Sequence, residues 1–400
     1  MNQKVKDEIK FRKSLYIDAI EGKKKPARVP LTCNDRTGKI FDMGYKLSDC
    51  LYDYEKMDDC VYGYHKKYEF DTYYDLGTRN PIKAMDNFDV KLYDIDDEKG
   101  ILQFVDKTYM QDPEKGYHQI LKKGWDRYTY EDIYPIKYNF KNHDDAITRM
   151  AAFGKEYSTL LSYGAKRQKV YTEEFGVPKL YNYGGAPIPI GALFNSGTRG
   201  IYALSIDMRR YPDLLDEVLQ AMEEEFFKGF MQQVKNYKEN ENIVYAFSFP
   251  ILEHTIMNPK QFERYYWRYA KKRLDIMAEN NMKVYIHAEG TLLTFLDYLR
   301  DIPDNFASIM IEQDDPKVIK KALPNLTLSG GFPCVLLGHG TKQQCIDKAK
   351  EMIDELAYDG RYIYTTDKMI SYKNDVKEEN QLAVLNFLKE YAVFNETQTI

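Results

Sequence analysis

The chain has few cysteines, no long apolar run and no extended basic segment, and each absence excludes a class of protein. Its five cysteines form no Cys-x-x-Cys pair. An odd number of cysteines without an export signal predicts free thiols. No apolar run approaches the roughly 18 residues of a membrane-spanning helix, and the N-terminal segment has no apolar signal core. We therefore expect a cytoplasmic protein that does not insert into a membrane.

The net charge and the length of the chain limit its possible partners and its number of domains. The net charge is −5, and no cluster of Lys and Arg is long enough to reverse that balance locally. Because nucleic-acid binders need a basic surface, the sequence predicts no nucleic-acid partner. A chain of 400 residues is long enough for one large α/β domain or two smaller ones with an unassisted hydrophobic core.

Tyrosine is what the chain has in excess. It contains 35 tyrosines, and many of them fall between residues 52 and 74. Tyrosines on helix faces commonly serve as core and rim, and an aromatic-lined pocket is the alternative interpretation. The tyrosines of this segment are Tyr52, Tyr54, Tyr62, Tyr64, Tyr68, Tyr73 and Tyr74.

The second half of the chain alternates short apolar runs with amphipathic segments. The apolar runs predict strands, and each is followed by residues at helical spacing. Five successive βα units predict a parallel sheet with right-handed crossovers. The expected strands are 243–249, 283–287, 307–311, 326–331 and 361–365, and the expected helices include 316–323, 342–356 and 378–391.

The first half continues this pattern less regularly. We expect a strand at 28–33 after a leading helix, another at 180–183, and a long helix opened by Pro212. A count of eight strands predicts an α/β fold closed as a (β/α)8 TIM barrel, in a single domain over 1–400. Residues 80–140 fit poorly and show alternating runs such as 101–105. We expect them to form an inserted, β-rich excursion over the barrel mouth.

The segment from Val284 to Gly290 carries the clearest sign of chemistry. It is a short apolar strand followed by His287, Ala288 and Glu289. Because side chains alternate along a strand, His287 and Glu289 leave its end on the same side. The C-terminal ends of parallel strands are where α/β enzymes place their reactive groups. The alternative is a core histidine beside a solvated glutamate.

Several ordered motifs give the chain a family resemblance. They are Tyr285-Ile-His287, Ser329-Gly-Gly-Phe-Pro333, Gly338-His-Gly-Thr341 and Lys377-Glu-Glu-Asn380, with Arg28-Val-Pro30 near the start. In this order the motifs resemble the uroporphyrinogen decarboxylase superfamily, most strongly from 243 to 394. The resemblance implies a TIM barrel. It also implies one of two activities, which are decarboxylation of porphyrinogens without a metal and zinc-dependent methyl transfer to or from a corrinoid.

The zinc branch of that family binds its metal through a His-x-Cys at one strand end and a second Cys after the last strand. Here His287 matches the histidine, Glu289 stands at the first Cys position and Asp367 at the second. The resemblance therefore implies a zinc site in which two carboxylates replace two thiolates with the same total charge. Such oxygen ligands leave the metal a stronger Lewis acid, which suits an ether oxygen better than a thiol.

Other assignments of these residues stay open. Asp367 is also suited to cap a helix, and Glu289 to cap the helix that follows it. Cys334, Glu253 and His254 are alternative or additional metal ligands, since they too follow predicted strands.

The favoured function is thus a zinc-dependent, O-demethylating methyltransferase. It would move a methyl group from a small methylated compound to the cobalt of a corrinoid protein. The favoured methyl donor is an aryl methyl ether. The chain has no Asp-x-His-x-x-Gly cobalamin signature, so the cobalamin must be carried by that partner protein. Tetrahydrofolate or a thiol as acceptor, and the oligomeric state, are left open.

Two other functions are weighed against it. A porphyrinogen decarboxylase of this family opens with an Arg-Gln-Ala-Gly-Arg stretch, whereas residues 32–39 contain Asp35 and Arg36 but no such stretch. An acidic mouth is also a poor host for a substrate with many carboxylates. The acidic residues expected there are Glu253, Glu289, Glu312 and Asp367. The third possibility is a non-catalytic binder or corrinoid chaperone, which the His287 cluster argues against.

Overall fold

The computed structural model describes residues 2–78, 80–105, 107–194 and 198–394. Within them the main sheet has six parallel strands in the order β10-β9-β8-β7-β6-β5. This arrangement confirms the α/β class and the parallel sheet predicted from the sequence. The strands are β5 (Lys179–Tyr183), β6 (Ile243–Ile251), β7 (Val284–Ala288), β8 (Ala307–Ile311), β9 (Thr327–Gly330) and β10 (Tyr362–Ile363).

Two short strands from the N-terminal half extend this sheet. Strands β1 (Thr32–Cys33) and β2 (Thr72–Tyr73) pair in parallel with each other. A parallel bridge between Leu31 and Tyr364 joins β1 to β10, and the N–H of Thr32 donates to the carbonyl of Tyr364 at 2.9 Å. Eight parallel strands therefore follow one another from β2 through β1 and β10 to β5.

The two end strands of this series, β2 and β5, meet at what we call the β2–β5 seam. No strand pairing joins them among the described residues. Side chains span the seam instead, because the rings of Tyr74 and Tyr181 lie 5.7 Å apart and the Tyr181 hydroxyl donates to the Tyr74 carbonyl at 3.3 Å. Closure into a fully hydrogen-bonded barrel stays a prediction.

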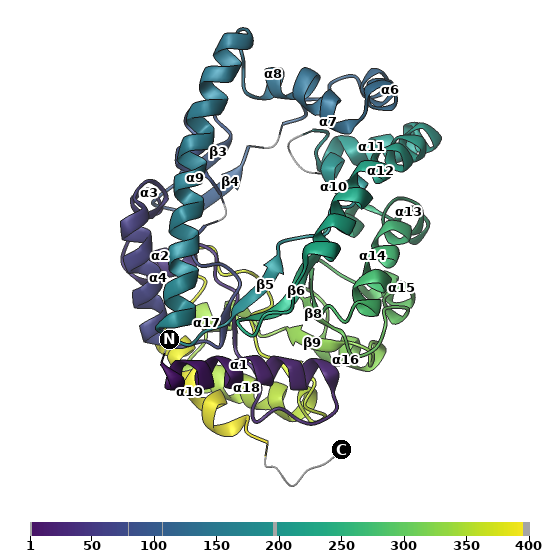
Figure 1. Cartoon of the computed structure of the whole chain (residues 1–400). Coiled ribbons are helices and arrows are strands. Elements are labelled where there is room, and N and C mark those ends of the chain that lie inside the picture. Colours follow the sequence, from purple (N-terminus) through teal and green to yellow (C-terminus); the bar gives the residue numbers. More distant parts are fainter. Residues whose placement is uncertain (1, 79, 106, 195–197, 395–400) are drawn as a thin grey trace.

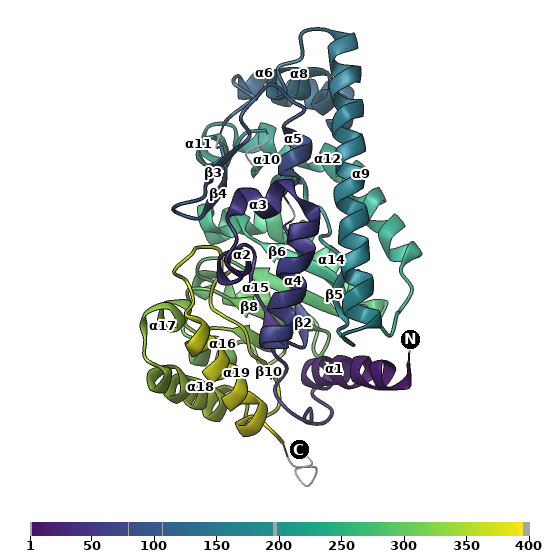
Figure 2. The same cartoon turned by 90° about the vertical axis from the view of Figure 1, so that its left-hand side faces the viewer.

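Helices surround the strands (Figure 1). In the N-terminal half they are α1 (Gln3–Glu21), α2 (Gly38–Asp42), α3 (Leu47–Tyr52), α4 (Tyr54–Tyr68), α5 (Ile82–Met85), α6 (Pro113–Lys123), α7 (Trp125–Tyr128), α8 (Tyr134–Lys137), α9 (His143–Glu173) and α10 (Pro189–Phe194). In the C-terminal half they are α11 (Ile201–Arg210), α12 (Pro212–Asn236), α13 (Pro259–Phe262), α14 (Arg268–Glu279), α15 (Leu296–Arg300), α16 (Pro316–Ala322), α17 (Cys334–His339), α18 (Lys342–Leu356) and α19 (Glu378–Tyr391). Figure 2 shows α4 and α9 side by side along one flank.

Helix α1 covers the N-terminal ends of the strands (Figure 1). The Tyr16 hydroxyl lies 2.8 Å from the hydroxyls of both Thr32 and Thr72, and the Thr327 hydroxyl donates to the Ala19 carbonyl at 2.7 Å. Because a buried hydroxyl left without a partner is costly, these bonds hold the helix against the strands. The helix thus covers the N-terminal ends of the strands, and the C-terminal ends remain as the place for an active site.

The segment 80–140 corrects one prediction. The alternating run at 101–105 does form a strand, β4 (Ile101–Phe104), which pairs antiparallel with β3 (Tyr93–Asp96). The rest is mostly helical rather than β-rich. One reason is local, since Asp112 caps α6 by accepting the N–H of Lys115 and Pro113 sits at the first helical position.

The described part of the chain contains no helix long and apolar enough to cross a membrane. All five cysteines are buried, reduced and unpaired, as their number predicts.

Candidate active site at the strand ends

The candidate site is built on the end of β7. His287 is buried, its Nε2 atom lies 3.6 Å from Oε1 of Glu289, and half of the Glu289 side chain is exposed. Strand alternation brings the two groups together, as the sequence analysis expects. The imidazole of His287 lowers the pKa of the Glu289 carboxyl, and Arg36 and His254 act weakly in the same direction while burial opposes them. Glu289 is therefore a carboxylate at neutral pH.

A tyrosine from the other half of the chain covers this histidine. The ring of Tyr74 stacks on His287 with centroids 5.4 Å apart and 27° between the planes. Tyr285 completes the aromatic group, 6.0 Å from Tyr74 and 6.4 Å from His287. No sequence motif singles out Tyr74 as a site residue. The tyrosine-rich segment 52–74 was the only sequence feature that pointed to it. In that segment Tyr73 packs against helix residues, whereas Tyr74 packs against residues of the strands.

A second histidine lies next to the pair. His254 is buried at the end of β6, and neither ring nitrogen makes a hydrogen bond to a described residue. Its ring stands edge-on to Phe295 at 5.3 Å. Burial lowers the pKa of His254, although the nearby backbone of Glu289 and Thr291 works in the opposite direction. His254 is therefore a neutral imidazole at neutral pH.

Its neighbour Glu253 lies in an apolar environment. The carboxyl lines a cavity of about 250 Å³ together with Phe226, Phe249 and Tyr266. Burial raises the pKa of Glu253 to about 7, because removing a carboxylate from water disfavours its charged form. Glu253 therefore exchanges its proton near neutral pH, unlike Glu289 beside it.

Asp367 and Cys334 belong to a different local structure. Oδ1 of Asp367 accepts the N–H of Cys334 at 2.9 Å, at the first residue of α17. Burial raises the pKa of Asp367, and the negative charge of Glu312 adds to the shift. Cys334 is fully buried, and burial raises its thiol pKa to about 12. Glu312 itself accepts the N–H of Gly290 at 2.6 Å.

The predicted zinc ligands can be placed in this structure. His287 and Glu289 fit a divalent cation as a pair, because Nε2 of His287 lies 3.6 Å from Oε1 of Glu289 and the carboxylate is ionised. Within the described ranges, however, no three His, Cys, Asp or Glu side chains form a group that could hold a metal ion. The structure thus brings together two of the three predicted ligands and leaves Asp367 apart.

The interior beside this pair is polar. In or just after four strands, a buried side-chain polar atom has no hydrogen-bond partner among the described residues. Buried polar groups are nearly always paired in proteins, so such a set marks a place for a polar ligand or water. The residues are Asn34 after β1, Tyr285 in β7, Ser329 in β9 and Thr365 after β10.

Comparisons with known proteins agree with this architecture. The family model described as uroporphyrinogen decarboxylase (URO-D) matches residues 182–391. A solved structure, a methyltransferase from Methanosarcina mazei, has a similar fold with a TM-score of 0.59 at 14% sequence identity. The similarity covers 95% of this chain and 98% of that one. No curated protein matches the sequence.

The match at 182–391 includes β6 through β10 and the residues His287 and Glu289, and it spans more than half of the 400 residues. The chain therefore belongs to the uroporphyrinogen decarboxylase (URO-D) family.

Proposed function

We propose that the protein is a methyltransferase that takes a methyl group from a small methylated compound, best an aryl methyl ether, and passes it to the cobalt of a corrinoid protein. The observation that carries the proposal is the stack of Tyr74 on His287, with Glu289 beside it, at the end of β7. The fold shared with a protein named as a methyltransferase supports the same reading.

The chemistry of the transfer suits this arrangement. The reduced cobalt of the partner attacks the methyl carbon, the carbon–oxygen bond breaks, and its electron pair stays on the oxygen as a phenolate. Tyr74 and Tyr285 offer ring faces against which an aryl group can pack. Glu253, which holds its proton up to about pH 7, is a nearby acid for the departing oxygen.

A zinc ion fits the proposal as an additional component. His287 and Glu289 would hold it, and bound zinc would supply Lewis acidity toward the ether oxygen. Asp367, the third ligand predicted from the sequence, lies apart from this pair in the structure. Metal analysis of protein purified without chelator should find about one equivalent. His287→Ala and Glu289→Ala should lose most of it, whereas His339→Ala, at an exposed histidine of α17, should not. Full zinc in both site variants would contradict the assignment.

The activity itself is tested with a methoxybenzene donor and chemically reduced cobalamin. We expect methylcobalamin in the visible spectrum and an equal amount of phenol by chromatography. His287→Ala should reduce the rate at least about a hundredfold, since it removes a group placed at the reacting atoms. Transfer from methylamine or a methyl thioether, with none from any aryl ether, would redirect the substrate class.

Porphyrinogen decarboxylation is the alternative function, and the name of the family favours it. The charge at the mouth does not, because the ionised Glu289 would face a substrate rich in carboxylates. Loss of carboxylates from uroporphyrinogen on incubation with the protein, without any methyl transfer, would establish this alternative in place of our proposal.

A further inference from the structure

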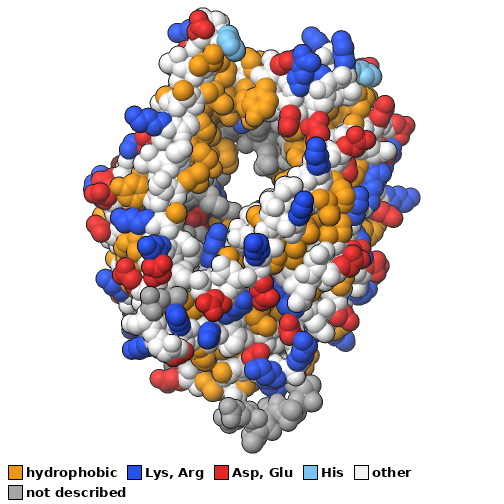
Figure 3. Space-filling model, viewed as in Figure 1, with side chains coloured by type: hydrophobic (Ala, Val, Ile, Leu, Met, Phe, Trp, Pro, Cys, Tyr) orange, Lys and Arg blue, Asp and Glu red, His pale blue; other side chains and the backbone are white. Residues whose placement is uncertain are grey.

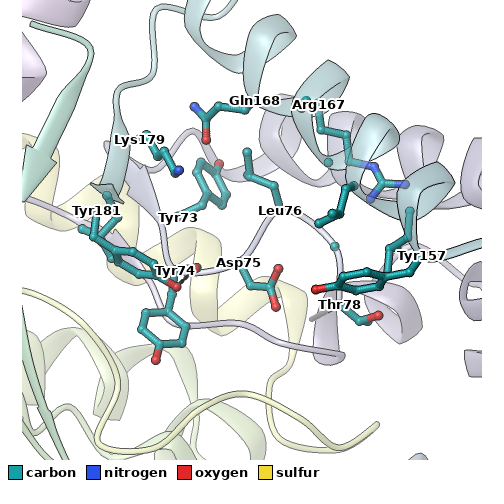
Figure 4. Close-up of a pocket in the computed structure, with 16 residues that line it drawn as sticks. Tyr73, Tyr74, Asp75, Leu76, Thr78, Tyr157, Arg167, Gln168, Lys179 and Tyr181 are labelled. Atoms are coloured by element: carbon teal, nitrogen blue, oxygen red, sulfur yellow. Dashed lines mark hydrogen bonds between the residues drawn. The ribbon is translucent and has the colours of Figure 1, made fainter. Parts of the chain in front are cut away.

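A large cavity lies at the β2–β5 seam, outside the group formed by His287 and Glu289. Its volume is about 730 Å³, enough for a substituted aromatic ring and several waters. Its walls come from the loop after β2, from the middle of α9 and from the start of β5 (Figure 4). The side chains that define it are Tyr73, Tyr74, Leu76, Tyr157, Gln168 and Lys179.

The cavity exists because β2 and β5 do not pair. Helix α9 crosses the seam, and at Gly164 it has no side chain to fill the space. A Cβ placed on Gly164 would meet no atom within 4 Å. In the space-filling view the face between α9 and α12 is hollowed, and hydrophobic side chains gather along its α9 edge (Figure 3).

The cavity holds one cation that no carboxylate neutralises. Lys179 is half-buried, and no carboxylate of the described residues acts on its charge. Its ammonium has only a long contact of 3.5 Å with the carbonyl of Asn182, and burial lowers its pKa. By contrast, the nearby Arg167 guanidinium is bound to Asp58 and to the carbonyl of Tyr54.

The remaining wall is mostly aromatic and apolar, with Asp75, Thr78 and Gln168 as its other polar side chains (Figure 4). A half-buried ammonium beside tyrosine rings favours a ligand that brings its own negative charge and a flat apolar body. Tyr74 also connects the cavity to the candidate site. The same ring lies 5.7 Å from Tyr181 at the cavity and 5.4 Å from His287 at the strand ends.

We propose that the seam cavity binds an aromatic ring bearing a carboxylate, with Lys179 pairing the carboxylate and the tyrosines packing against the ring. This deepens the proposed function and rests on it for one point only, namely that the bound aromatic acid is the class of methyl donor. The binding itself is independent of methyl transfer, and it is therefore tested without corrinoid or metal.

The charge is tested by calorimetric titration with benzoate and with its neutral analogue benzamide. Benzoate should bind at least about tenfold more tightly than benzamide, because a charge-assisted hydrogen bond is lost with the carboxylate. Lys179→Met should remove that preference. Lys137→Met is the matched control, since Lys137 is also half-buried with a pKa lowered by burial, but lies outside the cavity.

The location is tested by filling the cavity. Gly164→Phe should weaken benzoate binding at least about tenfold. Gly154→Phe, in the same helix and with equally open space around its Cβ position, should not. Unchanged binding in both Lys179→Met and Gly164→Phe, or no preference for benzoate over benzamide, overturns the proposal. A loss of methyl transfer with these titrations intact counts against the proposed function alone.

Discussion

Tyr74 stacks on His287 across more than two hundred residues of sequence, with ring centroids 5.4 Å apart. The contact joins the loop after β2 to the end of β7. It places an aromatic wall directly over the imidazole that the sequence marks as the centre of the site. Tyr74 is 7% exposed and His287 4%, so each ring holds the other in place.

This contact predicts different effects for two substitutions at Tyr74. Tyr74→Ala should lower the free energy of unfolding by about 3 to 5 kcal/mol, because it leaves a cavity where a buried ring packed. Tyr74→Phe should cost less than about 1.5 kcal/mol, since it keeps the ring. Urea unfolding measures both. Equal losses would show that the hydroxyl, rather than the stacked ring, supports His287.

Glu253 predicts a pH dependence of stability. Its folded-state pKa of about 7 lies above the ordinary value of 4.5. The stability from this group is therefore complete below the unfolded pKa and is lost as pH rises through about 7. From about pH 5 to about pH 8, wild-type protein in chelator should lose about 2 kcal/mol more than Glu253→Gln. Exposed Glu279→Gln is the control and should follow the wild type. A Glu253→Gln variant with the wild-type pH profile would contradict the buried, protonated carboxyl.

Two substitutions at Asp367 should distinguish its role as a helix cap from a role in metal binding. Asp367→Ala removes the acceptor for the Cys334 N–H and should cost about 1 kcal/mol of stability. Asp367→Asn keeps an oxygen in that place and should unfold like the wild type. The zinc content of Asp367→Asn then shows whether Asp367 is also a zinc ligand, because a neutral amide is a poor zinc ligand. Full zinc in Asp367→Asn would leave Asp367 as a cap only.

Two glycines predict opposite responses to alanine. Gly331 has a φ of +79°, and its Cβ would lie 2.4 Å from the Pro316 side chain, so Gly331→Ala should destabilise the fold by more than about 1 kcal/mol. Gly164 lies inside α9 with open space around it, so Gly164→Ala should stabilise by about 0.5 to 1 kcal/mol. Thermal unfolding of both variants measures whether each substitution raises or lowers the stability. A stabilised Gly331→Ala would contradict the described turn after β9.

Strand and helix positions in the C-terminal half followed from the sequence almost residue by residue. The expected strands at 243–249, 283–287 and 307–311 correspond to β6, β7 and β8, because apolar runs and helical spacing are local patterns. The segment 80–140 was less predictable. Its Asp, Tyr and Lys content fits a hairpin and short helices equally well, and local capping at residues such as Asp112 decided in favour of helices.

The sequence by itself determined the pairing of His287 with Glu289, because two residues separated by one position on a strand must face the same side. It also determined that free thiols and a parallel sheet would form. Only the tertiary structure decided which distant groups join that pair. It brought Tyr74 onto His287, directed Asp367 to the N–H of Cys334, and left β2 and β5 unpaired around a cavity containing Lys179. Such contacts depend on how the eight strands and α9 pack together in space. Residue spacing along the chain does not encode which distant residues come into contact.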